Sequence, residues 1–405
     1  MTDKTLDVYY KGKQVGTLVE SKDQRILFQY SDTWIREGFS ISPFSLPLRN
    51  DVFMPKRSSL ESSRGLFGVF FDSLPDAWGE LLLERYLLSI GVRDITVLDR
   101  LAYVGHSGKG ALEYYPSKAA CYSLQGIDYD EIAEECEKVL DSQPVDHLDR
   151  LYQLGGTSGG TRPKILIREG DQHWIIKFPA SHDPKNSGKT EYLYSLSAKK
   201  CQIKMTKTQL LSSKLCDGYF KTERFDRRGD EKKFAVTFAG LLETDYRVPS
   251  CDYSTYMKLT HILSRGNEEQ LEQIYRVMCF NVKAHNLDDH TKNFSFLFDE
   301  NCGWYLAPAY DLTYSNTYFG EHTTSVNGKG KGIQDSDLIS VGMKAGLKKD
   351  RCVDICDQIK EEAEHLIEVA GEGSLKKKAG KVSVSERVDE LAGNSGESPT
   401  DPRYH

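Results

Sequence analysis

The sequence predicts an α+β fold in which a small β-rich subdomain precedes two lobes. Apolar and polar residues alternate through residues 6–30 in the manner of short strands. Further on, Lys177 lies inside an apolar strand pattern that follows a glycine-rich segment, and helix-period stripes dominate from 255 to 370. The expected divisions are a β-rich subdomain with linking helices over 1–115, a lobe containing the glycine-rich loop over 116–225, a mostly helical lobe over 226–370 and a disordered tail over 371–405.

Composition limits the classes of protein that fit this chain. It has 405 residues, of which 39% are hydrophobic and 28% charged, and its formal net charge is −7. That acidic balance argues against a chain that coats nucleic acid by itself. No apolar run reaches the length of a membrane span, and the polar N-terminus does not resemble a secretory signal. The nine cysteines lack a C-x-x-C spacing, so we expect reduced thiols in a cytoplasmic protein.

The N-terminal region is expected to form strands and then helices. Strands are predicted at 6–10, 15–19 and 25–30. Ser73 is placed to cap a helix with Pro75 in its first turn, and the apolar face of that helix extends to Ile90. A second helix is predicted near 96–104. We identify no recognisable chemistry in this region.

A glycine-rich segment, L-G-G-T-S-G-G-T at 154–161, is followed by Lys164 and an apolar strand. Glycines let backbone N–H groups approach a phosphate closely, and a lysine just beyond them can meet its charge. The segment is not a Walker A motif, because a strand follows it rather than a helix. A flexible surface loop is the alternative interpretation.

Lys177 is the lysine inside the apolar strand pattern H-W-I-I-K-F-P. A charge in such a strand is costly unless it is paired. In kinases, a strand lysine of this kind pairs with nucleotide phosphates and with a helix glutamate. Glu191, at the start of the next predicted helix, is the candidate partner. An edge-strand lysine that faces water is the alternative.

Asp288 and Asn293 have the D-x-x-x-x-N spacing of a kinase catalytic loop. In such a loop the Asp accepts the substrate hydroxyl proton and the Asn holds magnesium. A hairpin with its turn at 299–303 is predicted next, and it would return Asp311 towards Asn293. One Asn and one Asp supply the hard oxygen ligands that Mg²⁺ prefers. The spacing alone is weak, because Asp and Asn are common in turns. The loop, the hairpin and Asp311 together favour a catalytic role for this segment.

The remaining pattern completes the two lobes. Residues 219–227 are expected to form a strand that leaves one lobe for the other, beside the place where an adenine would lie. Residues 235–242 are expected to be strand and loop. Helices with apolar faces are predicted at 255–263, 271–283 and 351–370.

Five motifs stand in order along the chain: G-T-S-G-G-T-R-P-K, W-I-I-K-F-P, E-R-F-D-R, N-L-D-D-H-T-K-N-F-S and A-P-A-Y-D-L-T. They resemble the motifs of the HipA toxin kinases of bacterial HipA–HipB toxin–antitoxin pairs. The resemblance covers residues 6–370, and the D-D-H-x-K-N block is its most specific part. It implies a two-lobed kinase-like fold with a mostly helical C-terminal lobe, and phosphorylation of serine or threonine with ATP and Mg²⁺.

The resemblance also implies roles for single residues. Asp288 would be the catalytic base, and Asn293 and Asp311 would hold magnesium. The residues that would bind the nucleotide are Gly159, Gly160, Thr161, Lys164, Lys177, Glu223, Phe225, His290, Lys292 and Tyr310. In the family, a hydroxyl of the glycine-rich loop is autophosphorylated, which silences the kinase. Thr157 matches that position best, and Ser158 is the alternative.

Partners and substrate follow from the same resemblance. A HipB-like helix-turn-helix antitoxin is expected, with operator DNA contacted mainly through it and no membrane involved. The expected substrate is an aminoacyl-tRNA synthetase, glutamyl-tRNA synthetase foremost, whose phosphorylation would stop growth. Two alternatives stay open: an antitoxin-bound co-repressor with little catalysis, and a kinase for a lipid or small molecule.

Overall fold

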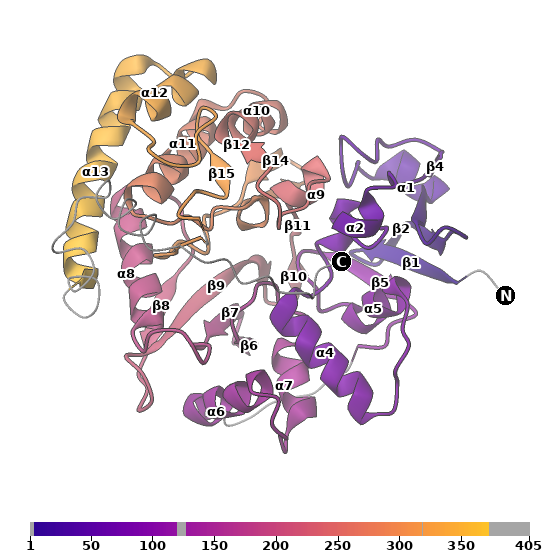
Figure 1. Cartoon of the computed structure of the whole chain (residues 1–405). Helices are drawn as coiled ribbons and strands as arrows, with labels where there is room; N and C mark the ends of the chain where they lie inside the picture. The colour runs from indigo at the N-terminus through magenta and orange to yellow at the C-terminus, as the bar shows by residue number, and fades with distance from the viewer. Residues whose placement is uncertain (1–3, 120–126, 318, 372–405) are drawn as a thin grey trace, which may run out of the picture.

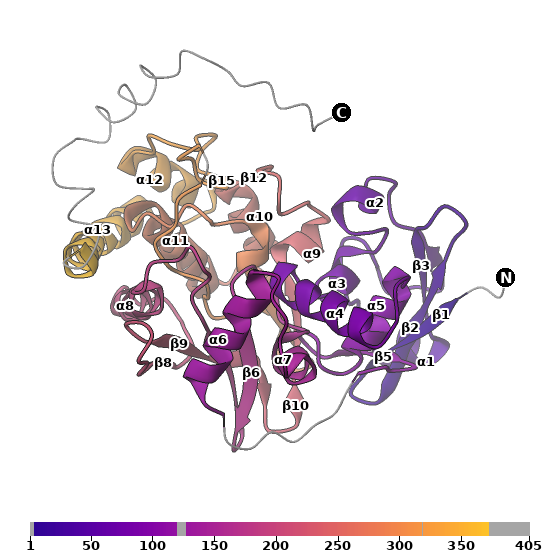
Figure 2. The same cartoon turned by 60° about the horizontal axis from the view of Figure 1, so that its bottom comes forward.

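The computed structural model describes residues 4–119, 127–317 and 319–371 (Figure 1). Figures 1 and 2 both place the N-terminal sheet and the last helix, α13 (Lys349–Gly371), at opposite ends of the molecule. The predicted tail at 371–405 lies outside the described residues beyond Gly371. Within the described ranges, no helix combines the length and the apolar character needed to cross a bilayer.

A five-stranded antiparallel sheet forms the N-terminal subdomain, in the order β4-β3-β2-β1-β5. The strands are β1 (Thr5–Tyr10), β2 (Lys13–Glu20), β3 (Ile26–Tyr30), β4 (Val52–Phe53) and β5 (Leu112–Tyr115). Its helices are α1 (Asp32–Glu37), α2 (Ser59–Ser62), α3 (Gly68–Phe71), α4 (Ala77–Ser89) and α5 (Val97–Val104). The three strands predicted between residues 6 and 30 are therefore confirmed. Their alternating burial fixes the register in which they pair.

Helix α4 begins later than the sequence predicts. Its N-cap residue is Asp76 and not Ser73, and Ile90 is 50% exposed instead of ending the apolar face. The helix buries Trp78 and Leu82 in a core that it shares with Ile165 of the following lobe. Helix α4 therefore packs against the following lobe. Figures 1 and 2 both show it beside α7 of that lobe.

The middle lobe, residues 127–232 in our usage, contains a second antiparallel sheet in the order β10-β9-β7-β6, with β8 paired to β9. The strands are β6 (Lys164–Glu169), β7 (Gln172–Lys177), β8 (Thr208–Leu211), β9 (Tyr219–Arg228) and β10 (Glu231–Lys232). The helices are α6 (Tyr129–Leu140), α7 (Leu148–Gly155) and α8 (Ser187–Lys200). Helix α7 and strand β8 were not predicted. Helix α7 runs directly into the glycine-rich loop.

The C-terminal lobe, residues 233–371, is mostly helical around a three-stranded sheet in the order β11-β13-β14. The strands are β11 (Phe234–Thr237), β12 (Cys251–Asp252), β13 (Ser295–Asp299), β14 (Gly303–Leu306) and β15 (Thr324–Ser325). Besides α13, the helices are α9 (Phe238–Leu242), α10 (Tyr253–Leu263), α11 (Glu268–Lys283), the 3-10 turn η1 (Thr291–Asn293) and α12 (Asp335–Lys344). The predicted β13–β14 hairpin is confirmed. The loop expected within 235–242 is wrong, because Thr237 caps the Gly240 N–H and starts α9.

The N-terminal subdomain and the C-terminal lobe share one hydrophobic core. Phe39 stacks on Phe298 with ring centroids 3.9 Å apart and meets Phe234 edge-on at 5.3 Å. Asp72 accepts hydrogen bonds from the Thr237 backbone N–H at 2.6 Å and from its hydroxyl at 2.7 Å. The subdomain is thus packed against the lobe that carries the polar loop at 284–293.

Candidate functional site

Lys177 joins the middle lobe to the C-terminal lobe. It lies at the end of β7, and its ammonium donates to Glu191 of α8 at 2.6 Å. The same ammonium forms an ion pair with Asp311, which follows the β13–β14 hairpin. The pairing of Lys177 with Glu191 agrees with the sequence prediction. The contact with Asp311 brings the strand lysine to a predicted metal ligand.

The charges of Lys177, Glu191 and Asp311, the charged trio, stabilise one another. Burial alone would raise the pKa of Asp311, but Lys177 and Lys164 hold that pKa well below its ordinary value. Burial likewise would lower the pKa of Lys177, and Asp311 and Glu191 raise it above its ordinary value instead. Both groups are therefore ionised at neutral pH. Asp311 also has φ +54°, a left-handed conformation that is uncommon outside glycine and frequent at functional sites.

The glycine-rich loop runs from the end of α7 to Lys164, which faces Lys177 on the neighbouring strand. Lys164 begins β6, and its ammonium donates to the Gly159 carbonyl. Gly160 has φ +84°, so the reversal of the chain towards Lys164 depends on the absence of a side chain there. Gly159 and Thr161 are exposed. Backbone and ammonium donors thus gather where a phosphate would be held.

Asp288 stands in a polar loop whose backbone is fixed. Its own N–H donates to the Ser315 hydroxyl at 3.0 Å, and the Asn293 side-chain amide donates to its carbonyl at 2.7 Å. The Asp288 side chain is 59% exposed, and His290 Nε2 lies 3.8 Å from one carboxylate oxygen. A fixed backbone with an exposed carboxylate suits a group that must meet an incoming hydroxyl.

Asp289, the neighbour of Asp288, braces this loop from inside. It is fully buried and accepts hydrogen bonds from the Tyr253 hydroxyl at 2.9 Å and the Thr324 N–H at 3.0 Å. His322 Nδ1 lies 3.0 Å from the same carboxylate. The two adjacent aspartates therefore differ in position: Asp289 holds the loop from inside, and Asp288 projects from it into solvent.

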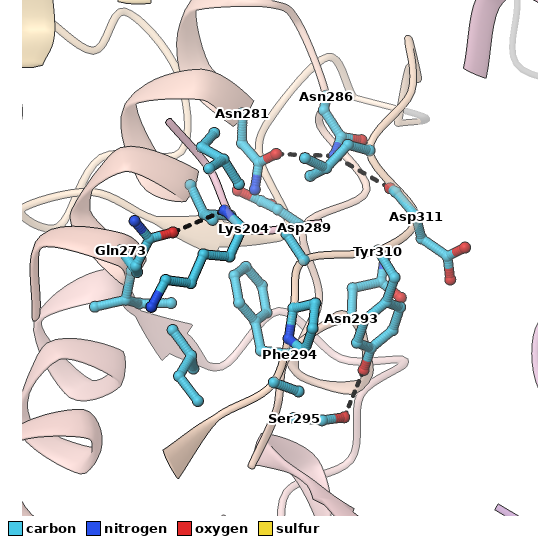
Figure 3. A pocket seen from close by; sticks show the side chains of 18 of the residues that line it. Lys204, Gln273, Asn281, Asn286, Asp289, Asn293, Phe294, Ser295, Tyr310 and Asp311 are labelled. Atoms are coloured by element: carbon cyan, nitrogen blue, oxygen red, sulfur yellow. Dashed lines mark hydrogen bonds between the residues drawn. The ribbon is translucent and has the colours of Figure 1, made fainter. Parts of the chain in front are cut away.

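A cavity of about 50 Å³ lies behind the loop, lined by residues of α11, the polar loop and the segment 306–312. Figure 3 shows Asn293, Tyr310 and Asp311 on one side of it and Gln273 on the other. This volume is too small for a nucleotide and suits one or two water molecules. The cavity does show that the hairpin returns Asp311 to the neighbourhood of Asn293.

Asn293 and Asp311 fit the demands of Mg²⁺. In the described part of the chain, His, Cys, Asp and Glu side chains form no cluster of three or more that could hold a metal ion by themselves. Mg²⁺ usually takes one or two protein carboxylates or amides and completes its shell with phosphate and water. Asp311 is ionised and lines the same cavity as Asn293, so one carboxylate and one amide would supply such a pair.

The other predicted nucleotide residues divide into two groups. The Tyr310 hydroxyl donates to the Lys292 carbonyl at 2.7 Å, and the Tyr310 ring lies 5.4 Å from that of Phe225. Tyr310 thus contacts the polar loop, to which Lys292 and His290 belong, and Phe225 lies against Tyr310. Glu223 instead lies near the middle of β9 and accepts from Gln172 Nε2 at 3.3 Å. Its place beside an adenine stays a prediction.

The two candidate hydroxyls for autophosphorylation are both engaged. The Thr157 hydroxyl donates to the Ser107 carbonyl at 3.3 Å. The Ser158 hydroxyl donates to the Gly155 carbonyl at 2.6 Å, and Ser158 is only 3% exposed. In this conformation Thr157 is the more accessible of the two.

The N-terminal region contributes side chains that sequence reasoning missed. Asp76 accepts a hydrogen bond from the Gly160 N–H at 2.8 Å and forms an ion pair with Lys292. Lys109 donates to the Ser295 hydroxyl at 3.0 Å and to the Tyr310 hydroxyl at 3.3 Å. These contacts were not predicted from the sequence. No local pattern singles out Asp76, which the sequence predicts to lie inside a helix that starts at Ser73.

Comparison with known proteins agrees with this arrangement. The profile of the HipA N-terminal domain matches residues 6–115, and that of the HipA-like C-terminal domain matches residues 156–367. A Sinorhizobium fredii protein named "Putative kinase Y4mE" is 24% identical over 353 residues, 78% of this chain and 79% of that protein. A second, "Putative kinase Y4dM", is 23% identical over 374 residues, 86% of this chain and 88% of that protein.

Among solved structures, HipA from a Shewanella oneidensis complex of HipA, HipB and operator DNA has a TM-score of 0.67. It is 17% identical and the match covers 96% of this chain and 94% of that one. The predicted α+β, two-lobed kinase-like fold is thereby confirmed. Within this class, the chain belongs to the HipA family, as the five motifs indicated.

Proposed function

We propose that this protein is a serine/threonine kinase that transfers the γ-phosphate of Mg·ATP to a protein hydroxyl, acting as the toxin of a toxin–antitoxin pair. One observation carries the proposal. Lys177 contacts both Glu191 and Asp311, which supports their assignment as the strand lysine, the helix glutamate and the metal-binding aspartate of a kinase site. This pairing must be in place in a protein kinase before phosphate can be transferred.

Each residue then has a task that follows from its position. Lys177 and Lys164 would meet the negative charge of the phosphates, with loop N–H groups at 159–160 adding hydrogen bonds. Asp288 would accept the proton of the substrate hydroxyl, and its exposure lets a protein side chain approach. When bound through Asn293 and Asp311, Mg²⁺ would neutralise charge that develops on the phosphates.

Partners and substrate follow from family membership. We propose a HipB-like helix-turn-helix antitoxin and, through it, operator DNA, as in the Shewanella complex. The proposed substrate is a serine or threonine of an aminoacyl-tRNA synthetase in the cytoplasm. We also propose that Thr157, the more accessible of the two candidate hydroxyls, is the site of inhibitory autophosphorylation.

Asp288→Asn tests the assignment of the base. The amide keeps the shape of the side chain but cannot accept a proton, so phosphate transfer should fall by about 10²–10⁴-fold. Calorimetric titration with Mg·ATP should give an affinity close to that of the wild type, because Asp288 is not among the residues proposed to hold the phosphates or the metal.

The control is Asp311→Ala, which should weaken Mg·ATP binding itself. Unchanged turnover in Asp288→Asn, measured as phosphate appearing on a synthetase, would remove Asp288 from the role of base. Unchanged Mg·ATP affinity in Asp311→Ala would remove Asp311 from the metal site.

A further inference from the structure

Asp76 behaves unusually for a residue that begins a helix. An Asp at the N-cap position normally accepts hydrogen bonds from the first N–H groups of its own helix. The Asp76 side chain makes no such bond to α4. It reaches instead across the molecule to the Gly160 N–H at 2.8 Å and to the Lys292 ammonium. Its side chain is 16% exposed, so this is an interior contact.

The two groups that Asp76 contacts are hydrogen-bond donors of the kind that bind phosphate. The N–H of Gly160, a glycine with positive φ, and a lysine ammonium are both hydrogen-bond donors that bind phosphate oxygens well. Lys164, which donates to the adjacent Gly159 carbonyl, adds positive charge on the same side. Burial would raise the pKa of Asp76, but Lys292 lowers it below its ordinary value, so the carboxylate is ionised. The Asp76 carboxylate therefore occupies hydrogen-bond donors that could otherwise bind a phosphate.

The loop lies on the N-terminus of α4 over several residues. The Asp76 N–H donates to the Ser158 carbonyl and the Trp78 N–H donates to the Gly160 carbonyl, each at 3.3 Å. A Cβ on Gly79 would come within 2.7 Å of the Ser158 carbonyl oxygen, so the helix approaches the loop backbone closely. In this docked position Ser158 is buried and the Thr157 hydroxyl is bonded to Ser107.

We propose that the Asp76 carboxylate is a latch that holds the glycine-rich loop docked on α4, and that a nucleotide phosphate displaces it by taking the Gly160 N–H and Lys292. This inference rests on the proposed function, because it assigns a regulatory step to the same site. Binding of the nucleotide releases Lys292 from Asp76 and loosens the loop. The loop hydroxyls then leave their backbone partners, which is the condition for their phosphorylation.

Hydrogen-exchange mass spectrometry without nucleotide tests the latch. Asp76→Asn removes the charge with little change of shape. Asp76→Ser also removes it and keeps a good helix cap, which protects against loss of folding. Peptides covering residues 156–161 should exchange about tenfold faster in both variants, since a hydrogen bond to a charged group is lost. Asp94→Asn, at an exposed aspartate of the same subdomain, should leave exchange unchanged. Unchanged loop exchange in both Asp76 variants would overturn the latch.

Calorimetry with magnesium and a non-hydrolysable ATP analogue tests the exchange of anions. Removing the competing carboxylate should tighten binding, by about tenfold, in both Asp76 variants. Equal or weaker binding would make Asp76 a structural clamp and overturn the proposal. Absence of binding in wild type and variants alike would contradict the proposed function, and loop exchange alone would then decide whether Asp76 is a latch.

Discussion

Lys164 and Lys177 face each other on neighbouring strands, yet their surroundings move their pKa values in opposite directions. Lys177 has two carboxylates in contact and stays charged. Burial and the charge of Lys177 lower the pKa of Lys164 to about 8. The difference arises from tertiary contacts that the sequence does not display, although the sequence does place both lysines.

This difference predicts a pH dependence of nucleotide binding. Lys164 is charged below pH 8 and neutral above it, so above pH 8 a phosphate can bind fully only after the lysine takes up a proton. Affinity for Mg·ATP should therefore fall from pH 7 to pH 9, approaching about tenfold per pH unit at the upper end. Calorimetry across this range measures the slope.

Lys164→Arg is the control, because arginine stays charged throughout the range. Its affinity should be nearly independent of pH, whatever its absolute value. The same slope in wild type and Lys164→Arg would show that another group causes the pH dependence.

The elements that the sequence predicted best are those whose pattern is local. Strands β1 to β3, the hairpin β13–β14 and helix α11 all carry strong period-2 or period-3.6 signals. Helix α9 was missed because it has five residues and depends on the Thr237 cap. The spacing of Asp288 and Asn293 indicated a catalytic loop, but nothing local distinguishes the exposed Asp288 from the buried Asp289.

The two neighbouring aspartates should give opposite results when each is replaced by alanine. Asp289→Ala leaves the Thr324 N–H and the Tyr253 hydroxyl buried without an acceptor, which should cost about 2–4 kcal/mol of unfolding free energy. Asp288→Ala removes an exposed carboxylate and should change stability by less than about 0.5 kcal/mol. Urea denaturation compares the two. Equal losses would contradict the bracing role of Asp289.

At the scale of the whole molecule, the sequence predicted the order of the parts but not their contacts. Asp76 and Lys292 are 216 residues apart, and no periodicity links such distant positions. The subdomain was expected to be a β-rich attachment without chemistry. Its α4 instead supplies core residues to the middle lobe, and its sheet shares a core with the C-terminal lobe. Only the folded chain shows that Asp76 and Lys109, both within the first 115 residues, contact the candidate site.

The shared core predicts that the N-terminal subdomain and the C-terminal lobe unfold together. Phe39→Ala removes the ring that stacks on Phe298, and should lower stability by about 2–3 kcal/mol in both parts. Hydrogen-exchange peptides from β2 and β13 should lose protection at the same urea concentration, in the wild type and in the variant. Phe44→Ala, at a residue that is 48% exposed, is the control. Separate midpoints for β2 and β13 would contradict a shared core.

The most direct test of the kinase assignment is the intact mass of the protein after incubation with Mg·ATP, starting from unphosphorylated material. The wild type should gain one phosphate, which peptide mapping places on Thr157 or Ser158, and Asp288→Asn should gain none. This result would show that the residues around Lys177, Asp288 and Asp311 transfer phosphate. An unmodified wild type, or equal phosphorylation of both proteins, would contradict the account.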